Sequence, residues 1–185
     1  MSETVLALGL SSIDLLLFAG GTLLRHHAAG DDVEVRVESE LEPPAVRAAW
    51  EKLAQPGPRF FVLHELSALW SGLSPTIVYL PQAPFYCPEA AQLLRMVLAV
   101  AREEGGGALQ LLAYPTEELL ASPVEPFAPH VYVDVTAQAA VKRRGLAGLG
   151  EARLQRAEIE AARRGAAAGL SAAEAFTLLF ERIAP

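Results

Sequence analysis

The chain has 185 residues, of which 52% are hydrophobic, and its formal net charge is -7. This length suits one compact domain, and the apolar content excludes an intrinsically disordered chain. With 22 acidic and 15 basic residues, the chain lacks the clustered basic surface that nucleic-acid binding requires. We therefore expect a single domain over residues 1–185, with no nucleic-acid partner.

The amino-terminal stretch Val5–Leu24 is apolar but does not have the pattern of a membrane segment. Asp14 interrupts it, and the uncharged run Leu15–Leu24 is only about half of a bilayer span. Glu3 stands where a signal peptide would be positively charged. The single cysteine, Cys87, excludes an intramolecular disulfide and suits a reducing compartment. We expect a cytoplasmic protein with no membrane partner.

The beginning of the chain predicts a β-α-β unit. The continuous apolar run Val5–Gly9 is typical of a strand that is buried on both faces. Apolar residues then recur at helical spacing from Asp14 to Ala29, and Gly30 is placed to end that helix. Valines alternate with charged residues over Val33–Val37, which predicts a strand with one exposed face. A helical connection of this kind joins parallel strands.

The rest of the chain repeats this alternation. Further strands are predicted at Phe60–Leu63, Thr76–Leu80, Leu109–Ala113 and Val131–Val135. Further helices are predicted at 43–53, 88–102, 137–148, 151–165 and 171–182, and the proline-rich segment Thr116–Pro129 is expected to be a surface excursion. The pattern indicates an α/β fold: a single doubly wound, mostly parallel, Rossmann-like sheet with helices on both faces. Ligands of such sheets bind beyond the carboxyl ends of the strands, which here places them near Leu10–Ile13, Ser39–Leu41 and Pro81–Cys87.

Four sequence elements occur in an order that resembles one enzyme family. The segment Val5–Gly30 reads VLALGLSSIDLLLFAGGTLLRHHAAG, and Thr76–Ala99 reads TIVYLPQAPFYCPEAAQLLRMVLA. YVDVT and Lys142 follow, and Ala173–Phe176 reads AEAF. In this order they resemble the PIG-L (LmbE-like) N-deacetylases, in which one strand leads into H-P-D-D-E and a second into H-P-D-H. The resemblance covers nearly the whole chain.

The resemblance implies a zinc site whose first motif has been replaced here. In the family, the histidine and second aspartate of H-P-D-D hold zinc, and the first aspartate is the general base. A gapless match places Ser11 at the ligand histidine, Ser12 at the proline and Ile13 at the general base. Asp14 is the only retained ligand position.

The second motif has also changed. In the family, the first histidine of H-P-D-H assists catalysis and the last one binds zinc. Cys87 stands at the catalytic histidine, Glu89 at the aspartate and Ala90 at the last ligand. A catalytic zinc site needs about three protein ligands, and a lost general base costs about 10²–10⁴ in rate. We therefore expect no zinc or other cofactor, no catalytic residue at the family positions, and no hydrolysis of the family's N-acetylglucosamine conjugates.

Three of the candidate pocket residues can each be interpreted in two ways. Asp14 is either a helix-terminal carboxylate favoured by the macrodipole or a remaining metal ligand. Cys87 is predicted to be a helix N-cap, and is either a small buried residue or a reactive thiolate. Arg47 matches a family arginine that contacts substrate, or lies on a solvated helix face. The full candidate set is Ser11, Ser12, Asp14, Arg47, Cys87 and Glu89.

Three functional hypotheses follow. The first is a non-catalytic PIG-L-like protein that binds a small molecule or a protein. The second is a hydrolase with a rebuilt metal or thiol site formed by Asp14, Cys87 and Glu89, with His64 as a further candidate. The third is a structural subunit that assembles with an active paralogue. The resemblance also implies a homo-oligomer, since relatives in the family commonly form oligomers.

Overall fold

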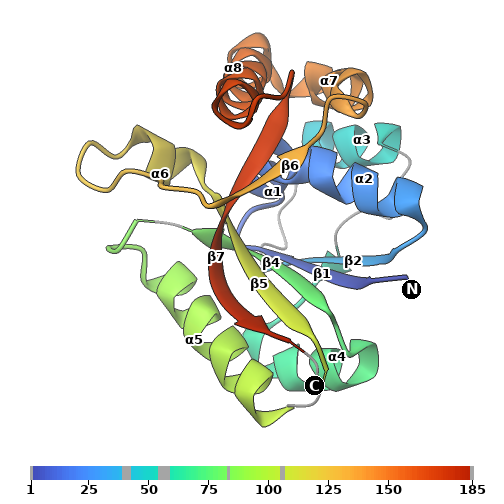
Figure 1. Cartoon of the computed structure of the whole chain (residues 1–185), viewed down its shortest axis with the longest axis vertical. Helices are drawn as coiled ribbons and strands as arrows, with labels where there is room; N and C mark the ends of the chain where they lie inside the picture. The colour runs from blue at the N-terminus through green and yellow to red at the C-terminus, as the bar shows by residue number, and fades with distance from the viewer. Residues whose placement is uncertain (1, 39–42, 54–58, 83, 105–106, 184–185) are drawn as a thin grey trace.

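The computed structural model describes residues 2–38, 43–53, 59–82, 84–104 and 107–183, and is built around a seven-stranded sheet (Figure 1). The strand order is β3-β2-β1-β4-β5-β7-β6. The strands are β1 (Thr4–Gly9), β2 (Asp32–Val37), β3 (Arg59–Phe60), β4 (Ile77–Gln82), β5 (Leu109–Pro115), β6 (Val131–Asp134) and β7 (Ala173–Arg182).

The sheet is parallel over β3, β2, β1, β4 and β5. β7 is antiparallel to both of its neighbours, β5 and β6. The predicted α/β fold with one wound sheet is therefore confirmed. The description "mostly parallel" is only partly accurate, because β7 introduces two antiparallel pairings.

Helices cover both faces of the sheet (Figure 1). One face carries α1 (Ser12–Phe18), α2 (Gly20–Ala29), α3 (Pro44–Lys52), α7 (Ala139–Leu146) and α8 (Glu151–Ala168). The other carries α4 (Leu66–Leu73) and α5 (Pro88–Glu103). Two 3₁₀ turns, η1 (Leu63–Glu65) and η2 (Ala147–Leu149), and α6 (Glu117–Ala121) complete the described elements. Within the described part of the chain, none of the helices has the length and apolar content needed to cross a bilayer.

The buried strand β1 explains why two hydrophobic layers form. Its side chains alternate between the faces, so Val5 and Ala7 pack beneath α1, α2 and α3 while Leu6 and Leu8 pack beneath α4 and α5. All four of these side chains are inaccessible to solvent. This is the environment that the continuous apolar run predicted.

The helix predicted over residues 171–182 is wrong, because this segment is strand β7. Its sequence, AEAFTLLFER, is rich in residues with high helix propensity. In the fold, Ala173–Phe176 pair with β6, and the remainder of the strand pairs with β5. Pairing and burial between two strands decide the structure here, and they outweigh the local propensity.

Other differences concern element boundaries. The predicted helix Asp14–Ala29 is interrupted at Ala19 and forms α1 and α2, while Gly30 ends it in a left-handed conformation (φ 83°) as expected. The predicted strand Phe60–Leu63 is reduced to β3, and η1 follows it. Helices α4 and α6 were not predicted; α6 lies in the segment expected to be a surface excursion. The predicted ligand loop Ser39–Leu41 lies outside the described residues.

Gly165 marks the closest approach of α8 to the segment that leads into β7. A Cβ at this position would lie 2.8 Å from the Leu170 carbonyl oxygen and 2.9 Å from backbone atoms of Ala172. We expect Gly165→Ala to lower the free energy of unfolding by about 1–3 kcal/mol, because backbone cannot move aside as a flexible side chain can.

Gly72→Ala in α4 is the matched control. Its Cβ would meet no atom within 4 Å, so a gain of about 0.5–1 kcal/mol is expected. Urea denaturation measures both, and a stabilised Gly165→Ala protein would contradict the packing account.

Candidate functional site

The segment that the resemblance matched to the first motif lies where β1 passes into α1, at the carboxyl end of the sheet. Ser11 is the N-cap of α1, and its Oγ accepts a hydrogen bond from the Ile13 N–H at 3.2 Å. Ser12 is buried in the first turn, while Ile13 is half-buried. Ser11 therefore has a structural role, because it satisfies a backbone donor at the helix end.

Asp14 links α1 to α6. Its Oδ1 accepts a hydrogen bond from the Glu117 backbone N–H, at 2.8 Å. Burial raises the pKa of Asp14 from 3.8 to about 6, against the lowering effect of that hydrogen bond, and the Glu117 carboxylate raises it further. The first-turn position predicted for Asp14 is confirmed. The direction of the pKa shift, however, is opposite to that of a carboxylate stabilised mainly by a helix dipole.

The segment that the resemblance matched to the second motif lies at the start of α5. Cys87 is the N-cap of α5, as predicted, and is partly exposed rather than buried. Its Sγ donates a hydrogen bond to Glu89 Oε2 at 3.6 Å, and Ala90 is buried in the first turn. Arg47 is exposed on α3, in agreement with the helix-surface interpretation, and His64 is exposed in η1.

The residues at these two helix termini do not fit a catalytic zinc ion. Within residues 2–38, 43–53, 59–82, 84–104 and 107–183, no three His, Cys, Asp or Glu side chains lie close enough to share a metal. Asp14, Cys87 and Glu89 all belong to these ranges, so they do not form a three-ligand group. Because a catalytic zinc ion needs about three protein ligands, we derive no chemical step through zinc.

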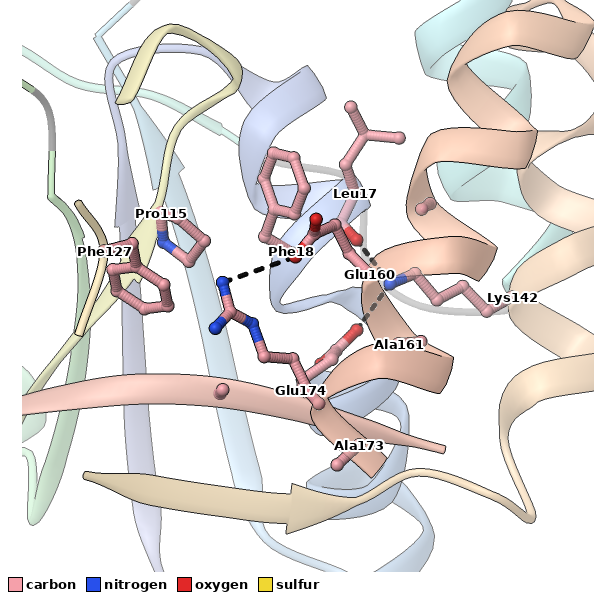
Figure 2. Close-up of a pocket in the computed structure, with 12 residues that line it drawn as sticks. Leu17, Phe18, Pro115, Phe127, Lys142, Glu160, Ala161, Ala173 and Glu174 are labelled. Atoms are coloured by element: carbon pink, nitrogen blue, oxygen red, sulfur yellow. Dashed lines mark hydrogen bonds and ion pairs between the residues drawn. The ribbon is translucent and has the colours of Figure 1, made fainter. Parts of the chain in front are cut away.

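Residues from α2, α7 and β7 come together at the break between α1 and α2, and the sequence did not predict this grouping. Figure 2 shows Lys142 and Glu174 beside Leu17. Glu174, on β7, accepts hydrogen bonds from the backbone N–H groups of Gly21 (2.8 Å) and Thr22 (2.7 Å) at the start of α2. Lys142, on α7, donates to Glu174 Oε1 at 2.6 Å and to the Leu17 carbonyl near the end of α1. We call this set the Lys142–Glu174 junction.

The junction places each charge where a helix end favours it. The carboxylate faces the amino terminus of α2, and the ammonium faces the carboxyl terminus of α1. The two side chains are only 8% and 3% exposed, so each charge depends on these partners. A Cβ at Gly21 would lie 3.0 Å from Glu174 Oε1, which explains the glycine. The AGGTL, lysine and AEAF elements of the resemblance therefore maintain the fold.

The cavity beside the junction is too small to bind a substrate. Its volume is about 20 Å³, which is room for about one water molecule. Arg164 lines the cavity, with its guanidinium 4.9 Å from the Phe127 ring centroid and 3.3 Å from Glu160 Oε2. This part of the molecule is a packed structural centre.

Comparisons with known proteins find similarity in structure only. No protein-family model matches the sequence, and no curated protein is similar to it. The conserved protein TT1542 from Thermus thermophilus has 19% identity and a TM-score of 0.75, with 99% of this chain and 97% of that chain covered. The 4-carboxy-2-hydroxymuconate hydratase GalB from Pseudomonas putida has 18% identity and a TM-score of 0.79, with 100% and 99% covered. N,N'-diacetylchitobiose deacetylase from Pyrococcus horikoshii has 13% identity and a TM-score of 0.70, with 96% and 84% covered.

These similarities define the fold of the chain. Its solved neighbours include deacetylases, and the identities are below 20% for all three proteins above. A hydratase and a deacetylase occur among them, so the fold is compatible with more than one reaction. Function must therefore be argued from the residues at the mouth of the sheet.

Proposed function

We propose that this chain is a degenerate member of the PIG-L/LmbE-like family that has no zinc-dependent hydrolase activity and acts by binding a ligand or partner. The proposal rests on the residues at the amino termini of α1 and α5, which lie at the carboxyl edge of the sheet. Ser11 serves as a helix cap, Asp14 binds the backbone of α6, and Ala90 is a buried methyl group. These residues supply one of about three metal ligands that catalysis requires.

Two independent losses support the absence of amide hydrolysis. Without a metal site, no water is activated at this position. Ile13 occupies the general-base position, and its side chain cannot accept a proton from a water that arrives there. Restoring one of these functions leaves the other missing.

The test is acetate release from N-acetylglucosamine conjugates in the presence of Zn²⁺. The natural sequence and Ser11→His are both expected to show no release above the buffer control. The combined Ser11→His, Ile13→Asp, Cys87→His and Ala90→His protein restores three histidines and the base, and is expected to regain zinc binding and trace turnover. Zinc-dependent turnover by the natural sequence, abolished by a chelator, would overturn the proposal.

A second candidate function has one observation in its favour. The pKa of about 6 at Asp14 suits a group that exchanges protons near neutral pH, as general acids and bases do. A metal-independent hydrolase that uses Asp14 as its general acid or base would account for this. Hydrolysis of small activated esters that persists with chelator and is lost in Asp14→Asn would favour this candidate, whereas equal background rates would exclude it.

The homo-oligomer, the pairing with an active paralogue and the cytoplasmic location remain predictions. Light scattering tests the homo-oligomer, and co-purification of a related chain tests the paired-subunit hypothesis. Fractionation of cells tests the cytoplasmic location.

A further inference from the structure

A cavity with largely apolar walls lies between α7 and α8. Its volume is about 170 Å³, and its lining includes five residues with small side chains: Ala139, Ala157, Ala161, Ala162 and Ala172. Ala157 is buried, whereas Ala139 and Ala162 are exposed, so the cavity extends from the core to the surface. We call it the α7–α8 cavity.

The charged groups that line the α7–α8 cavity already have partners. The Lys142 ammonium donates to Glu174, and Arg143 Nε lies 3.2 Å from Glu158 Oε1. A polar occupant would lose its hydrogen bonds to water and gain few in return, so the walls favour an uncharged, apolar group. A cavity of roughly 150 Å³ accommodates benzene, and a phenyl ring therefore fits here.

The turn before α5 displays a phenyl ring of this size. Phe85 is 75% exposed and Tyr86 is 55% exposed, although small polar residues and glycine are usual in turns. The Cys87 N–H donates to the Pro84 carbonyl at 2.9 Å and closes the turn. The Phe85 N–H donates to Glu125 Oε2 at 2.8 Å, which ties the turn to the segment after α6. Phe85 is thus held in place before any partner binds, and this lowers the entropic cost of burying it.

We propose that Phe85 of one copy of this chain inserts into the α7–α8 cavity of a second copy. This inference rests on the proposed function and names the partner. The loop that leads into α5 and the helices α7 and α8 lie on different sides of the molecule, so the contact joins two chains (Figure 1). Because it pairs two different surfaces, each bound copy leaves one turn and one cavity free, and the copies form a ring or an open chain.

The charges around the two surfaces are complementary. Glu125 lies beside Phe85 and Glu118 beside Tyr86, and neither glutamate forms an ion pair among the residues that the structure describes. Arg144 follows Arg143 on α7, is exposed, and also has no ion-pair partner in the described ranges. The acidic turn is therefore attracted to the α7–α8 surface of another copy and repelled by another turn.

Light scattering at increasing protein concentration measures the assembly. The chain mass is 19.7 kDa, and the natural sequence is expected to reach at least twice this mass. Phe85→Ser removes the ring and should weaken association roughly thirtyfold or more, as the loss of a central aromatic anchor does. Ala162→Phe places a ring at the exposed wall of the cavity and should weaken association to the same extent.

Two control variants make the same kinds of change elsewhere. Ile183→Ser removes an apolar side chain that is 82% exposed, and Ala152→Phe adds a ring to an exposed position of α8 that does not line the cavity. Both should assemble like the natural sequence. Circular dichroism establishes that each variant is folded.

Mixing the two disrupting variants provides the sharpest test. Phe85→Ser retains the cavity without the ring, and Ala162→Phe retains the ring without the open cavity. Each should be monomeric alone, and an equimolar mixture should give twice the chain mass, because one intact contact is restored. A monomeric natural protein, a mixture that stays monomeric, or a loss of assembly in only one of the two variants overturns the inference.

These outcomes are separate from those of the proposed function. Light scattering does not depend on hydrolysis, so a monomeric natural protein would overturn the contact and leave the acetate-release result unchanged. Zinc-dependent turnover would overturn the proposed function even if Phe85 joined two copies.

Discussion

Replacing Lys142 by methionine is expected to lower the free energy of unfolding by about 3–5 kcal/mol. Methionine matches the length of the lysine stem but leaves the Glu174 carboxylate 3% exposed without its countercharge. The two backbone N–H groups of α2 remain as donors to that carboxylate, but the Leu17 carbonyl loses the donor it has in Lys142. Urea denaturation followed by circular dichroism measures the loss.

The neighbouring residue provides a matched control. Arg143 also forms an ion pair with a glutamate, Glu158, at 3.2 Å, but its side chain is 65% exposed. Arg143→Met is expected to change the free energy of unfolding by less than about 1 kcal/mol, because exposed ion pairs contribute little. Equal effects of Lys142→Met and Arg143→Met would contradict the structural role of the junction. Addition of Glu174→Gln to Lys142→Met should recover part of the loss, since it removes the unpaired charge.

Asp14→Asn is expected to raise the free energy of unfolding at pH 8 by up to about 3 kcal/mol, since a pKa difference of one unit corresponds to about 1.4 kcal/mol. The pKa of Asp14 is raised from 3.8 to about 6 in the folded protein, so ionisation of this carboxyl favours the unfolded chain. Asparagine keeps an oxygen that accepts the Glu117 N–H but carries no charge. The gain comes from removing a half-buried charge while retaining its hydrogen bond.

The raised pKa of Asp14 determines how its contribution to the free energy of unfolding changes with pH. Below about pH 3, well under the unfolded value of 3.8, Asp14 is protonated in both states, and its stabilising contribution is fully present. That contribution is lost as pH rises from 3.8 towards 6, and the loss is then constant. The stability difference between Asp14→Asn and the natural sequence should therefore be near zero at about pH 3, rise between pH 4 and pH 6, and level off above pH 6.

Asp134→Asn is the control for this prediction. The side chain of Thr136 and its backbone N–H hydrogen-bond to Asp134 and lower its pKa. Its substitution should therefore give no gain at pH 8. A gain at Asp134 equal to that at Asp14 would point to a general effect of lowering the net negative charge.

The sequence predicts this fold well where one local pattern decides the structure. The run Val5–Gly9 and the alternation in Val33–Val37 both correspond to observed strands, and Gly30 and Cys87 stand at the predicted helix ends. The prediction failed for β7, whose Ala, Leu and Glu residues favour a helix until two neighbouring strands pair with it. Such pairing involves residues distant in sequence and has no local signal.

The candidate site shows the same limit. The sequence could show that Ser11, Ile13 and Ala90 carry neither an imidazole nor a carboxylate, since this depends on residue type. It could not show that Lys142 and Glu174, which are 32 residues apart, form a buried pair at the break between α1 and α2. A cavity at the amino terminus of α5 was equally unpredictable, because it is lined by residues from β4, α5, β5, β7 and the segment after α6.

The central claim is that the chain keeps the fold of the deacetylases while its mouth lacks a metal site. The most direct test is a calorimetric titration of the natural sequence with Zn²⁺ at pH 7.5, beside the protein that combines Ser11→His, Ile13→Asp, Cys87→His and Ala90→His. We expect no stoichiometric binding to the natural sequence and one bound ion per chain in the combined variant. One zinc ion bound by the natural chain, and lost in Asp14→Ala, would contradict the claim.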